Sequence, residues 1–227
     1  MINTAIFPMI FFAGLWVMFG RLLNAHGVAS AQALPTGVIA IYMLFSARSG
    51  GALIAGDRRS GLLTRLKTMP VHLGAAVLAR LLADAVRLLV TAVVVVIAGY
   101  VAGFRFTGGA AGAAGYFLVA LIFGSALVTA GVAAGIGSSN PEGTMSILQL
   151  VNLPLLMFSS ALVPTAVFPG WLQQVVRVSP ITCAVNAMRG LAAGTQVGSA
   201  LLWAALWVIG LGLLFGWLTG RGLRKVS

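Results

Sequence analysis

The chain has 227 residues, of which 60% are hydrophobic and only 7% are charged, and it carries a formal net charge of +11. Its mean hydropathy is +1.05. Soluble globular proteins carry about 25% charged residues, so this composition excludes a water-soluble globule and indicates an integral membrane protein. The single cysteine excludes an internal disulfide bond, and the three acidic residues leave no pair of carboxylates for acid–base catalysis.

Six apolar stretches are long enough to cross a bilayer, which requires about 20 mostly apolar residues. We predict membrane-spanning helices over residues 2–23, 35–54, 82–103, 113–137, 143–163 and 199–220 of a single domain, residues 1–227. The predicted fold is an all-α integral membrane protein. A cleaved signal peptide is the alternative for the first stretch, because small residues follow it at positions 29–33. Residues 1–4 carry no Lys or Arg, however, which favours a retained helix.

The basic residues that flank the predicted helices indicate their orientation, because cytoplasmic loops are enriched in Lys and Arg. With a cytoplasmic N-terminus, the inner side holds Arg58, Arg59, Arg65, Lys67, Arg221, Arg224 and Lys225, and the outer side holds only Arg21, Arg105, Arg177 and Arg189. This predicts a multi-pass protein of the cell (plasma) membrane with both termini in the cytoplasm. The positive net charge is then explained by the orientation of the chain in the membrane and by contact of its basic residues with anionic lipid headgroups. We expect no nucleic-acid partner, because no basic stretch is long enough to follow a phosphate backbone.

The segment from Asp57 to Pro70 interrupts the apolar sequence between the second and third predicted spans. Its apolar side chains recur at helical spacing on one side, and its polar ones fall on the other. The apolar set is Leu62, Leu63, Leu66 and Met69, and the polar set is Thr64, Arg65, Lys67 and Thr68. Pro70 ends the predicted helix. This short amphipathic helix either anchors the loop in the cytoplasmic membrane interface or docks a soluble partner.

Charged side chains inside the predicted spans are candidates for function, because a charge at mid-membrane costs about 2.5–3.5 kcal/mol on insertion scales. Arg80, Asp84 and Arg87 fall on one helical stripe, and Asp84 can pair with either arginine. The stripe is either a self-neutralising ladder near the interface or a gate at the mouth of a pathway. Arg48 either reaches the same interface or pairs with Asp84.

Polar amides and glycines mark further positions within the spans. Gln149 and Asn152 either bond to neighbouring helices or line a substrate path. Glycines four residues apart recur in three spans, which allows helix backbones to approach closely. They are Gly99 and Gly103, Gly131 and Gly135, and Gly212, Gly216 and Gly220. Packing within one chain is the expected use, and a dimer interface is the alternative.

Four blocks of sequence carry a resemblance to a known family. They are DRRSGLLTRLKTMPVH in the first cytoplasmic loop, LARLLADAVRLLV in the third span, a GFRF turn, and VPTAVFPGWLQQVVRVSPITCAVNAMRGLAAG before the last span. In their order and spacing, from about residue 5 to the end, they resemble the permeases of type-2 ABC exporters. The drug-resistance branch, typified by actinomycete daunorubicin exporter permeases, is the most similar. The resemblance implies a permease subunit that moves a hydrophobic or amphipathic drug, natural product or lipid out of the cell.

The resemblance also implies partners. In that family the first cytoplasmic loop holds a coupling helix that sits in a cleft of the ATPase. This assigns the coupling role to Asp57, Arg58, Arg59, Gly61, Leu62, Leu63, Arg65, Leu66 and Pro70. Two separate ATPase subunits would bind ATP and Mg²⁺, and a second permease, identical or not, would complete the pathway. We expect no cofactor or metal on this chain, because neither lysine follows a glycine as in a phosphate-binding loop and neither histidine has a metal-ligand partner at suitable spacing.

By the same resemblance, the residues before the last span form an external re-entrant hairpin that caps the outer exit. Pro169 and Pro180 divide it into short helices, and Trp171 favours the headgroup layer. Arg189 is expected to anchor to lipid phosphate. The family usually begins with an amphipathic elbow helix, whereas Met1 stands almost at the first span; either the start lies upstream or this member lacks the elbow.

Two other function classes are less consistent with the sequence. An ion-coupled secondary transporter is disfavoured because Asp84, the acid within the spans, is flanked by arginines and no inverted repeat is apparent. A membrane enzyme or a non-transport assembly factor is disfavoured because the chain offers no catalytic set of residues. The expected protein is therefore a transport subunit and not itself an enzyme.

Overall fold

The computed structural model describes residues 2–25, 30–59, 73–137, 141–161, 165, 168–195 and 197–226. Within these ranges the regular structure is entirely helical. The helices are α1 (Ile2–Ala25), α2 (Ser30–Arg59), α4 (Leu73–Val101), α5 (Gly109–Gly137), α6 (Pro141–Met157), α7 (Gly170–Val178), α8 (Pro180–Ala193) and α9 (Gly198–Val226). Four of them are long and apolar enough to cross a bilayer. An all-α membrane protein is thereby confirmed.

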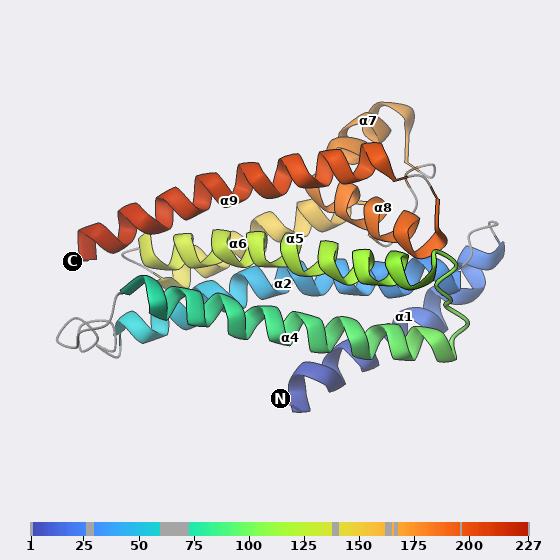
Figure 1. Cartoon of the computed structure of the whole chain (residues 1–227), viewed down its shortest axis with the longest axis horizontal. Helices are drawn as coiled ribbons and strands as arrows, with labels where there is room; N and C mark the ends of the chain where they lie inside the picture. The colour runs from blue at the N-terminus through green and yellow to red at the C-terminus, as the bar shows by residue number, and fades with distance from the viewer. Residues whose placement is uncertain are drawn as a thin grey trace.

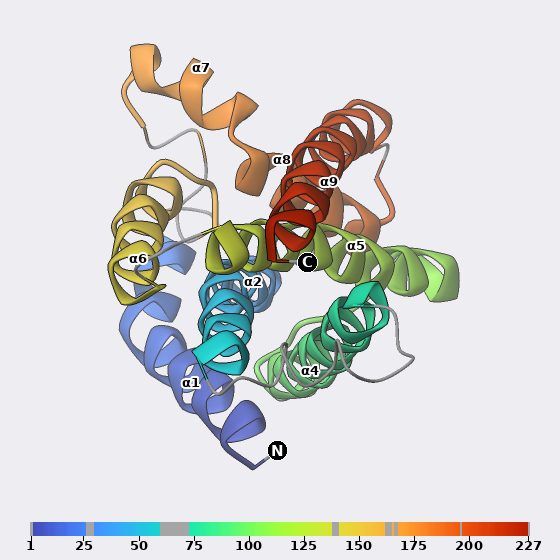
Figure 2. The ribbon, with the colours of Figure 1, turned by 90° about the vertical axis from the view of Figure 1, so that its left-hand side faces the viewer.

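The long helices run along one axis of the molecule and alternate in direction (Figure 1). The end of α2, the start of α4 and the end of α9 lie together at what we call the Arg59 end. The turn between α4 and α5 and the short helices α7 and α8 lie at the opposite end, which we call the hairpin end. Seen along the axis, α5 occupies the middle of the bundle, with α2, α4 and α9 around it (Figure 2).

Four candidate membrane spans overlap predicted ones, and each begins earlier than predicted. They are Ala31–Ile54, Leu78–Val101, Gly109–Ile136 and Gly198–Arg221. The helix α4 begins at Leu73, well before the predicted start at residue 82. Arg80 and Asp84 therefore lie within a continuous helix, and the stripe that they form with Arg87 is preserved.

The remaining two predicted spans correspond to α1 and α6, and their apolar parts, Pro8–Met18 and Ser146–Met157, are shorter. Because α6 ends at Met157, the predicted helical end at residue 163 is wrong. The N–H of Phe158 still donates to the carbonyl of Pro154, at 2.8 Å. The N–H of Ser160 then donates to the hydroxyl of Thr182 in α8, at 3.0 Å. A side chain of another helix thus replaces the intrahelical acceptor and ends α6.

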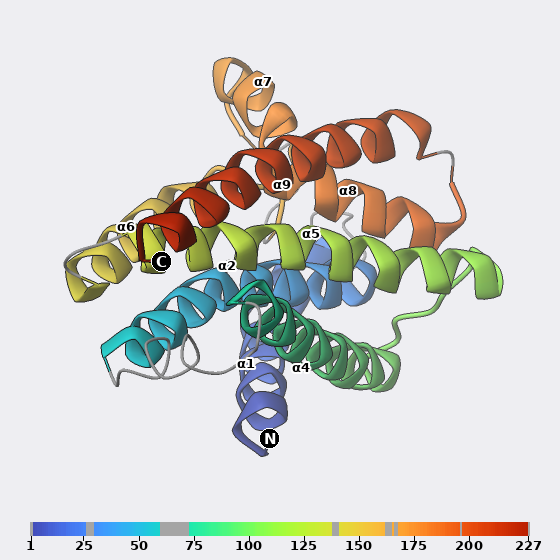
Figure 3. The ribbon, with the colours of Figure 1, turned by 60° about the vertical axis from the view of Figure 1, so that its left-hand side comes forward.

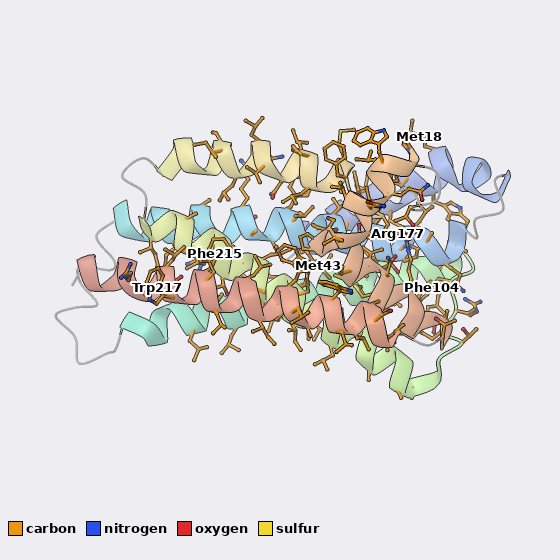
Figure 4. The ribbon with its side chains drawn as sticks, turned by 90° about the horizontal axis from the view of Figure 1, so that it is seen from above. Met18, Met43, Phe104, Arg177, Phe215 and Trp217 are labelled. Atoms are coloured by element: carbon orange, nitrogen blue, oxygen red, sulfur yellow. The ribbon has the colours of Figure 1, made fainter. Side chains whose placement is uncertain are left out.

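Close contact between α2 and α5 forms the centre of the core. Gly131 and Gly135 of α5 face the backbone carbonyl oxygens of Ala47 and Gly51, and a Cβ atom at either glycine would overlap these oxygens. The largest fully buried side chains of the described residues form one apolar cluster of the core and include Leu34, Ile39, Met43, Leu88, Phe104, Tyr116 and Phe123. Met43 accordingly lies near the middle of the molecule in Figure 4. This glycine pair is used for packing within the chain, as predicted.

In contrast, α9 lies along the outside of the bundle (Figure 3). Only 6% of its 18-residue apolar window is buried within the described structure. At Gly212, Gly216 and Gly220 no described atom other than the neighbouring backbone of α9 itself lies within 4 Å of the position that a Cβ would take. The glycine spacing of α9 is therefore not used for packing against the described part of the chain, and this face is available to lipid tails or to another subunit.

Candidate functional site

The helices α7 and α8 form a helical hairpin (Figures 2 and 3). Pro169 precedes α7, Ser179 forms the bend, and Pro180 is the first residue of α8, so the proline breaks predicted from the sequence are present. Gly194 ends α8 in the left-handed conformation, with φ of 68°. Trp171 on α7 is 75% exposed, whereas most of α8 is buried. The two helices thus differ: α8 belongs to the core, and α7 lies at its edge.

Arg189, in the last part of α8, joins three segments of the chain. Its Nη2 atom donates to the carbonyl of Ala33 in α2 and to the carbonyl of Ala161 just after α6, both at 3.3 Å. Its Nε atom is buried and has no partner among the described residues. The structure therefore gives Arg189 backbone partners in place of the lipid phosphate that the sequence suggested.

Three more polar side chains lie at this junction, and together with Arg189 we call them the polar clamp: Ser160, Thr182 and Asn186. The N–H of Ser160 donates to Thr182, and its hydroxyl donates to Oδ1 of Asn186 at 3.4 Å. Thr182 is completely buried. Each of these bonds crosses from the segment after α6 to α8, so the polar clamp fixes the end of α6 to the hairpin.

The end of α8 is also attached to the turn between α4 and α5. The N–H groups of Thr107 and Gly108 both donate to the carbonyl of Ala192, at 2.8 and 3.1 Å. Gly108 and Gly112 lie so close to the carbonyl oxygen of Leu191 that a Cβ atom at either would overlap it. The helix α8 is therefore held by α2, by the start of α5 and by the end of α6.

An apolar groove with a volume of about 850 Å³ lies between α6, α7 and α9. We call it the α6–α9 groove. Its walls are Leu150, Val151, Pro154 and Leu155 of α6, Phe158 just after α6, Gln174, Val175 and Val178 of α7, Ser179 and Pro180 at the bend, and Trp207 of α9. The indole N–H of Trp207 donates to the carbonyl of Val178 at 3.1 Å, which joins α9 to the hairpin. A groove of this size and apolarity suits a hydrocarbon chain or a ring system.

The α6–α9 groove could not be found from the sequence. Its walls come from three separate helices, and most of its residues are ordinary apolar side chains of a membrane protein. The only local signal is on α7, where Gln174 and Arg177 alternate with Val175 and Val178. That amphipathic pattern predicts an interfacial helix, but it does not predict what the apolar side faces.

The amides predicted on the fifth span have different surroundings. Asn152 donates from Nδ2 to the carbonyl of Leu44 in α2, at 3.1 Å. It therefore bonds to a neighbouring helix, one of the two roles considered for it. The Oε1 atom of Gln149 is buried and has no partner among the described residues. Gln149 thus stays a candidate for contact with a substrate.

Arg87 and Asp84 of the charged stripe of α4 form an ion pair, in which Arg87 Nη1 lies 3.2 Å from Asp84 Oδ1. The Asp84 side chain is 6% exposed and the Arg87 side chain is 48% exposed. The helix α2 approaches Asp84 at Gly50, where a Cβ would lie 3.4 Å from Oδ2. Arg48 is exposed, and its pairing with Asp84 stays a hypothesis because the structure gives Asp84 a different partner.

Replacing Asp84 by alanine is expected to lower the thermal unfolding midpoint of the purified protein, because it leaves the Arg87 guanidinium against an apolar helix. Since Arg87 is half exposed, the expected loss is small, about 1 kcal/mol. The double variant Asp84→Ala/Arg87→Ala should regain part of this loss, and Arg87→Ala serves as the matched single variant. Strictly additive losses in the double-mutant cycle would contradict the pairing.

Most of the predicted coupling segment lies outside the described residues. Asp57, Arg58 and Arg59 form the last turn of α2, and the stretch from Gly61 to Pro70, with Leu62, Leu63, Arg65 and Leu66, is not described. Its coupling role therefore stays a prediction. Among the described residues, no group of three His, Cys, Asp or Glu side chains could hold a metal ion.

The fold and the site define a class of protein, namely a helical, multi-pass membrane protein whose candidate site offers apolar surface. Comparison with known proteins then identifies the family. Residues 1–192 match the family described as ABC-2 type transporter. The chain therefore belongs to the ABC-2 type transporter family.

Relatives with curated names agree with this family. The chain is similar over its whole length to the probable doxorubicin resistance ABC transporter permease protein DrrC of Mycobacterium tuberculosis, with 30% identity and 82% of that protein covered. It is 29% identical to the daunorubicin resistance ABC transporter permease protein DrrB1 of Streptomyces coeruleorubidus, covering 93% of this chain and 72% of that protein. It is 31% identical to the doxorubicin resistance ABC transporter permease protein DrrB of Mycobacterium tuberculosis, covering 88% and 72%. The chain is thus a permease subunit of an ABC transporter.

Proposed function

We propose that this chain forms the membrane pathway of an ATP-driven exporter that moves a hydrophobic or amphipathic drug, natural product or lipid out of the cell. The match of residues 1–192 to the ABC-2 type transporter family carries this proposal. Relatives that are named for resistance to doxorubicin and daunorubicin favour export of an amphipathic aromatic compound. The apolar walls of the α6–α9 groove are compatible with such a cargo.

In the proposed complex the chain crosses the plasma membrane six times, with α1 and α6 as the two shorter crossings and both termini in the cytoplasm. The alternating directions of the long helices support this arrangement (Figure 1). The hairpin of α7 and α8 then lies on the outer side as a re-entrant element. Two ATPase subunits would bind ATP and Mg²⁺, and a second permease, identical or different, would form the other half of the pathway.

The residues that would receive the force of ATP binding lie at the Arg59 end. The helix α2 continues to Arg59, so Asp57 and Arg58 are a rigid extension of a core helix. The helix α4 begins at Leu73, directly after the undescribed segment. Because α2 packs tightly on α5 at Gly131, a displacement of the coupling segment would move the centre of the bundle.

Changing Leu62 and Leu66 to aspartate is expected to release the ATPase subunit from the purified complex. Both leucines lie on the apolar side of the predicted coupling helix, and two buried carboxylates would prevent that side from entering a cleft. The measurement is the amount of ATPase that co-purifies with the tagged permease. The matched control is Thr64→Asp/Thr68→Asp, which adds the same charge on the opposite side and should retain the ATPase. Equal release by both double variants would contradict the proposed orientation.

Export itself is tested with inside-out membrane vesicles that contain the permease and its ATPase. Addition of Mg-ATP should cause uptake of doxorubicin, measured by the loss of its fluorescence, and an ATPase variant that cannot hydrolyse ATP should abolish the uptake. If an intact complex took up neither doxorubicin nor any member of a panel of amphipathic antibiotics and lipids, the proposed export function would be rejected.

A further inference from the structure

We propose that the α6–α9 groove holds the acyl chain of an anionic phospholipid whose phosphate is bound by Arg177. The groove is open at the side of the bundle and almost wholly apolar. In a bilayer such a groove cannot stay filled with water, because water has no polar partners there. A hydrocarbon chain from the surrounding lipid can fill the groove in place of water, with no change in the protein.

The position of Arg177 identifies the headgroup. Arg177 lies in the last turn of α7, three residues after Gln174 and next to Val178, which both line the groove. Residues three apart on a helix are neighbours on its surface. Its side chain is exposed, and it lies at the end of the molecule opposite Trp217 (Figure 4). A phosphate bound there would place its lipid tails directly at the groove.

The charge distribution of the chain favours an anionic ligand at this position. The three acidic residues of the sequence belong to the other half of the molecule: Asp57 lies in the last turn of α2, Asp84 in the first half of α4, and Glu142 in the first turn of α6. Two other arginines at the hairpin end have protein partners. Arg105 donates to the carbonyls of Tyr100 and Phe104, and Arg189 belongs to the polar clamp. Any anionic partner of Arg177 would therefore come from outside the chain, and a lipid phosphate is such a partner.

A second observation, at the bend between α7 and α8, supports a lipid as the occupant of the groove. The hydroxyl oxygen of Ser179, at the bend between α7 and α8, is buried and has no hydrogen-bond partner among the described residues. Buried hydroxyl groups are rarely left unpaired. Ser179 lies two residues beyond Arg177 and lines the groove. The ester carbonyl of a lipid in the groove would offer an acceptor at this bend.

The test measures lipid retained by the purified complex after exchange into vesicles that contain equal amounts of phosphatidylglycerol and phosphatidylcholine. Native mass spectrometry counts both lipids on each permease. We expect a preference for phosphatidylglycerol of at least several-fold. Arg177→Ala should abolish the preference, and Val175→Trp, which fills the groove, should reduce retention of both lipids. Arg221→Ala is the charge-matched control at the opposite end, and it should retain the wild-type preference.

Three results would overturn the proposal. Equal retention of the two lipids by the wild-type complex would show that Arg177 selects no anionic headgroup. Displacement of phosphatidylglycerol by doxorubicin in proportion to its concentration would assign the groove to the transported compound. Efficient crosslinking between cysteines placed at Leu150 and Val175 of two different copies, in a Cys183→Ser background, would show that a second permease covers the groove. The lipid measurement requires no ATP-driven transport, so its failure is distinguishable from failure of the export function.

Discussion

Replacing Gly131 by valine is expected to prevent the chain from reaching its folded state. The Cβ of the new side chain would overlap the backbone carbonyl oxygen of Ala47, and a backbone atom in the middle of a packed helix cannot move aside as a flexible side chain can. Overpacking of a well-packed core costs about 1–3 kcal/mol, and sometimes more. Separation of α2 from α5 would affect the most extensive helix contact among the described residues, so we expect the upper part of this range or beyond.

The measurement is the yield of monodisperse, detergent-purified protein and its resistance to heat. The matched control is Gly216→Val in α9, which makes the same chemical change in a membrane helix where no described atom other than the neighbouring backbone of α9 itself lies within 4 Å of the new Cβ. The control should be close to the wild type in both yield and heat resistance. Equal losses for the two variants would show that the effect comes from valine in a helix and not from the contact between α2 and α5.

Replacing Arg189 by methionine is expected to loosen the hairpin and to expose Cys183 to a membrane-permeant maleimide. Arg189 holds the carbonyls of Ala33 and Ala161, and hydrogen bonds to a charged group contribute about 1.5–3 kcal/mol each. Part of the loss is offset, because a guanidinium that has only carbonyl partners is costly to bury. Cys183 is the only cysteine of the sequence and is buried in α8, so its reactivity reports directly on the packing of this helix.

The rate of maleimide labelling should rise at least several-fold in Arg189→Met and less in Arg189→Lys, which keeps a charged donor but loses the planar fork. The control is Arg177→Met, which removes an exposed arginine from the same hairpin and should leave Cys183 protected. A labelling rate in Arg189→Met equal to that of the wild type would show that the polar clamp does not hold α8 in place. ATP-dependent uptake of doxorubicin by the same variants would then relate the clamp to transport.

The predicted helices agree with the structure where the pattern was long and apolar, and they fail where tertiary contacts intervene. The pattern from residue 143 to 163 is apolar enough to continue as a helix. In the structure the helix stops at Met157, because the N–H of Ser160 is bound by Thr182 from α8. The third predicted span starts at residue 82, whereas α4 begins at Leu73. The apolar run marked the part of the helix that can cross the bilayer, and the helix continues before that part with Arg80 on its charged stripe.

The glycine pairs also show that a sequence pattern does not predict tertiary contacts. Four-residue spacing occurs in α4, α5 and α9, and it indicates in each case that a close approach is possible. The structure uses the pair at Gly131 and Gly135, whereas Gly103 lies in the turn after α4 with φ of 101°. The glycines of α9 face no described part of the chain. Glycine spacing shows where two helices can pack closely, but it does not show which helix packs there.

The sequence by itself determined the class of protein, the positions of the main spans and the resemblance to ABC exporter permeases, because apolar runs and ordered blocks are local properties of a chain. Only the tertiary structure decided that Arg189 binds carbonyls of α2 and of the segment after α6, and that α6, α7 and α9 line an open groove. The physical reason is that both features join residues far apart in sequence. An arginine next to the membrane interface has the same local pattern whether it faces a lipid phosphate or a helix end, and the packing of the surrounding helices determines which one it meets.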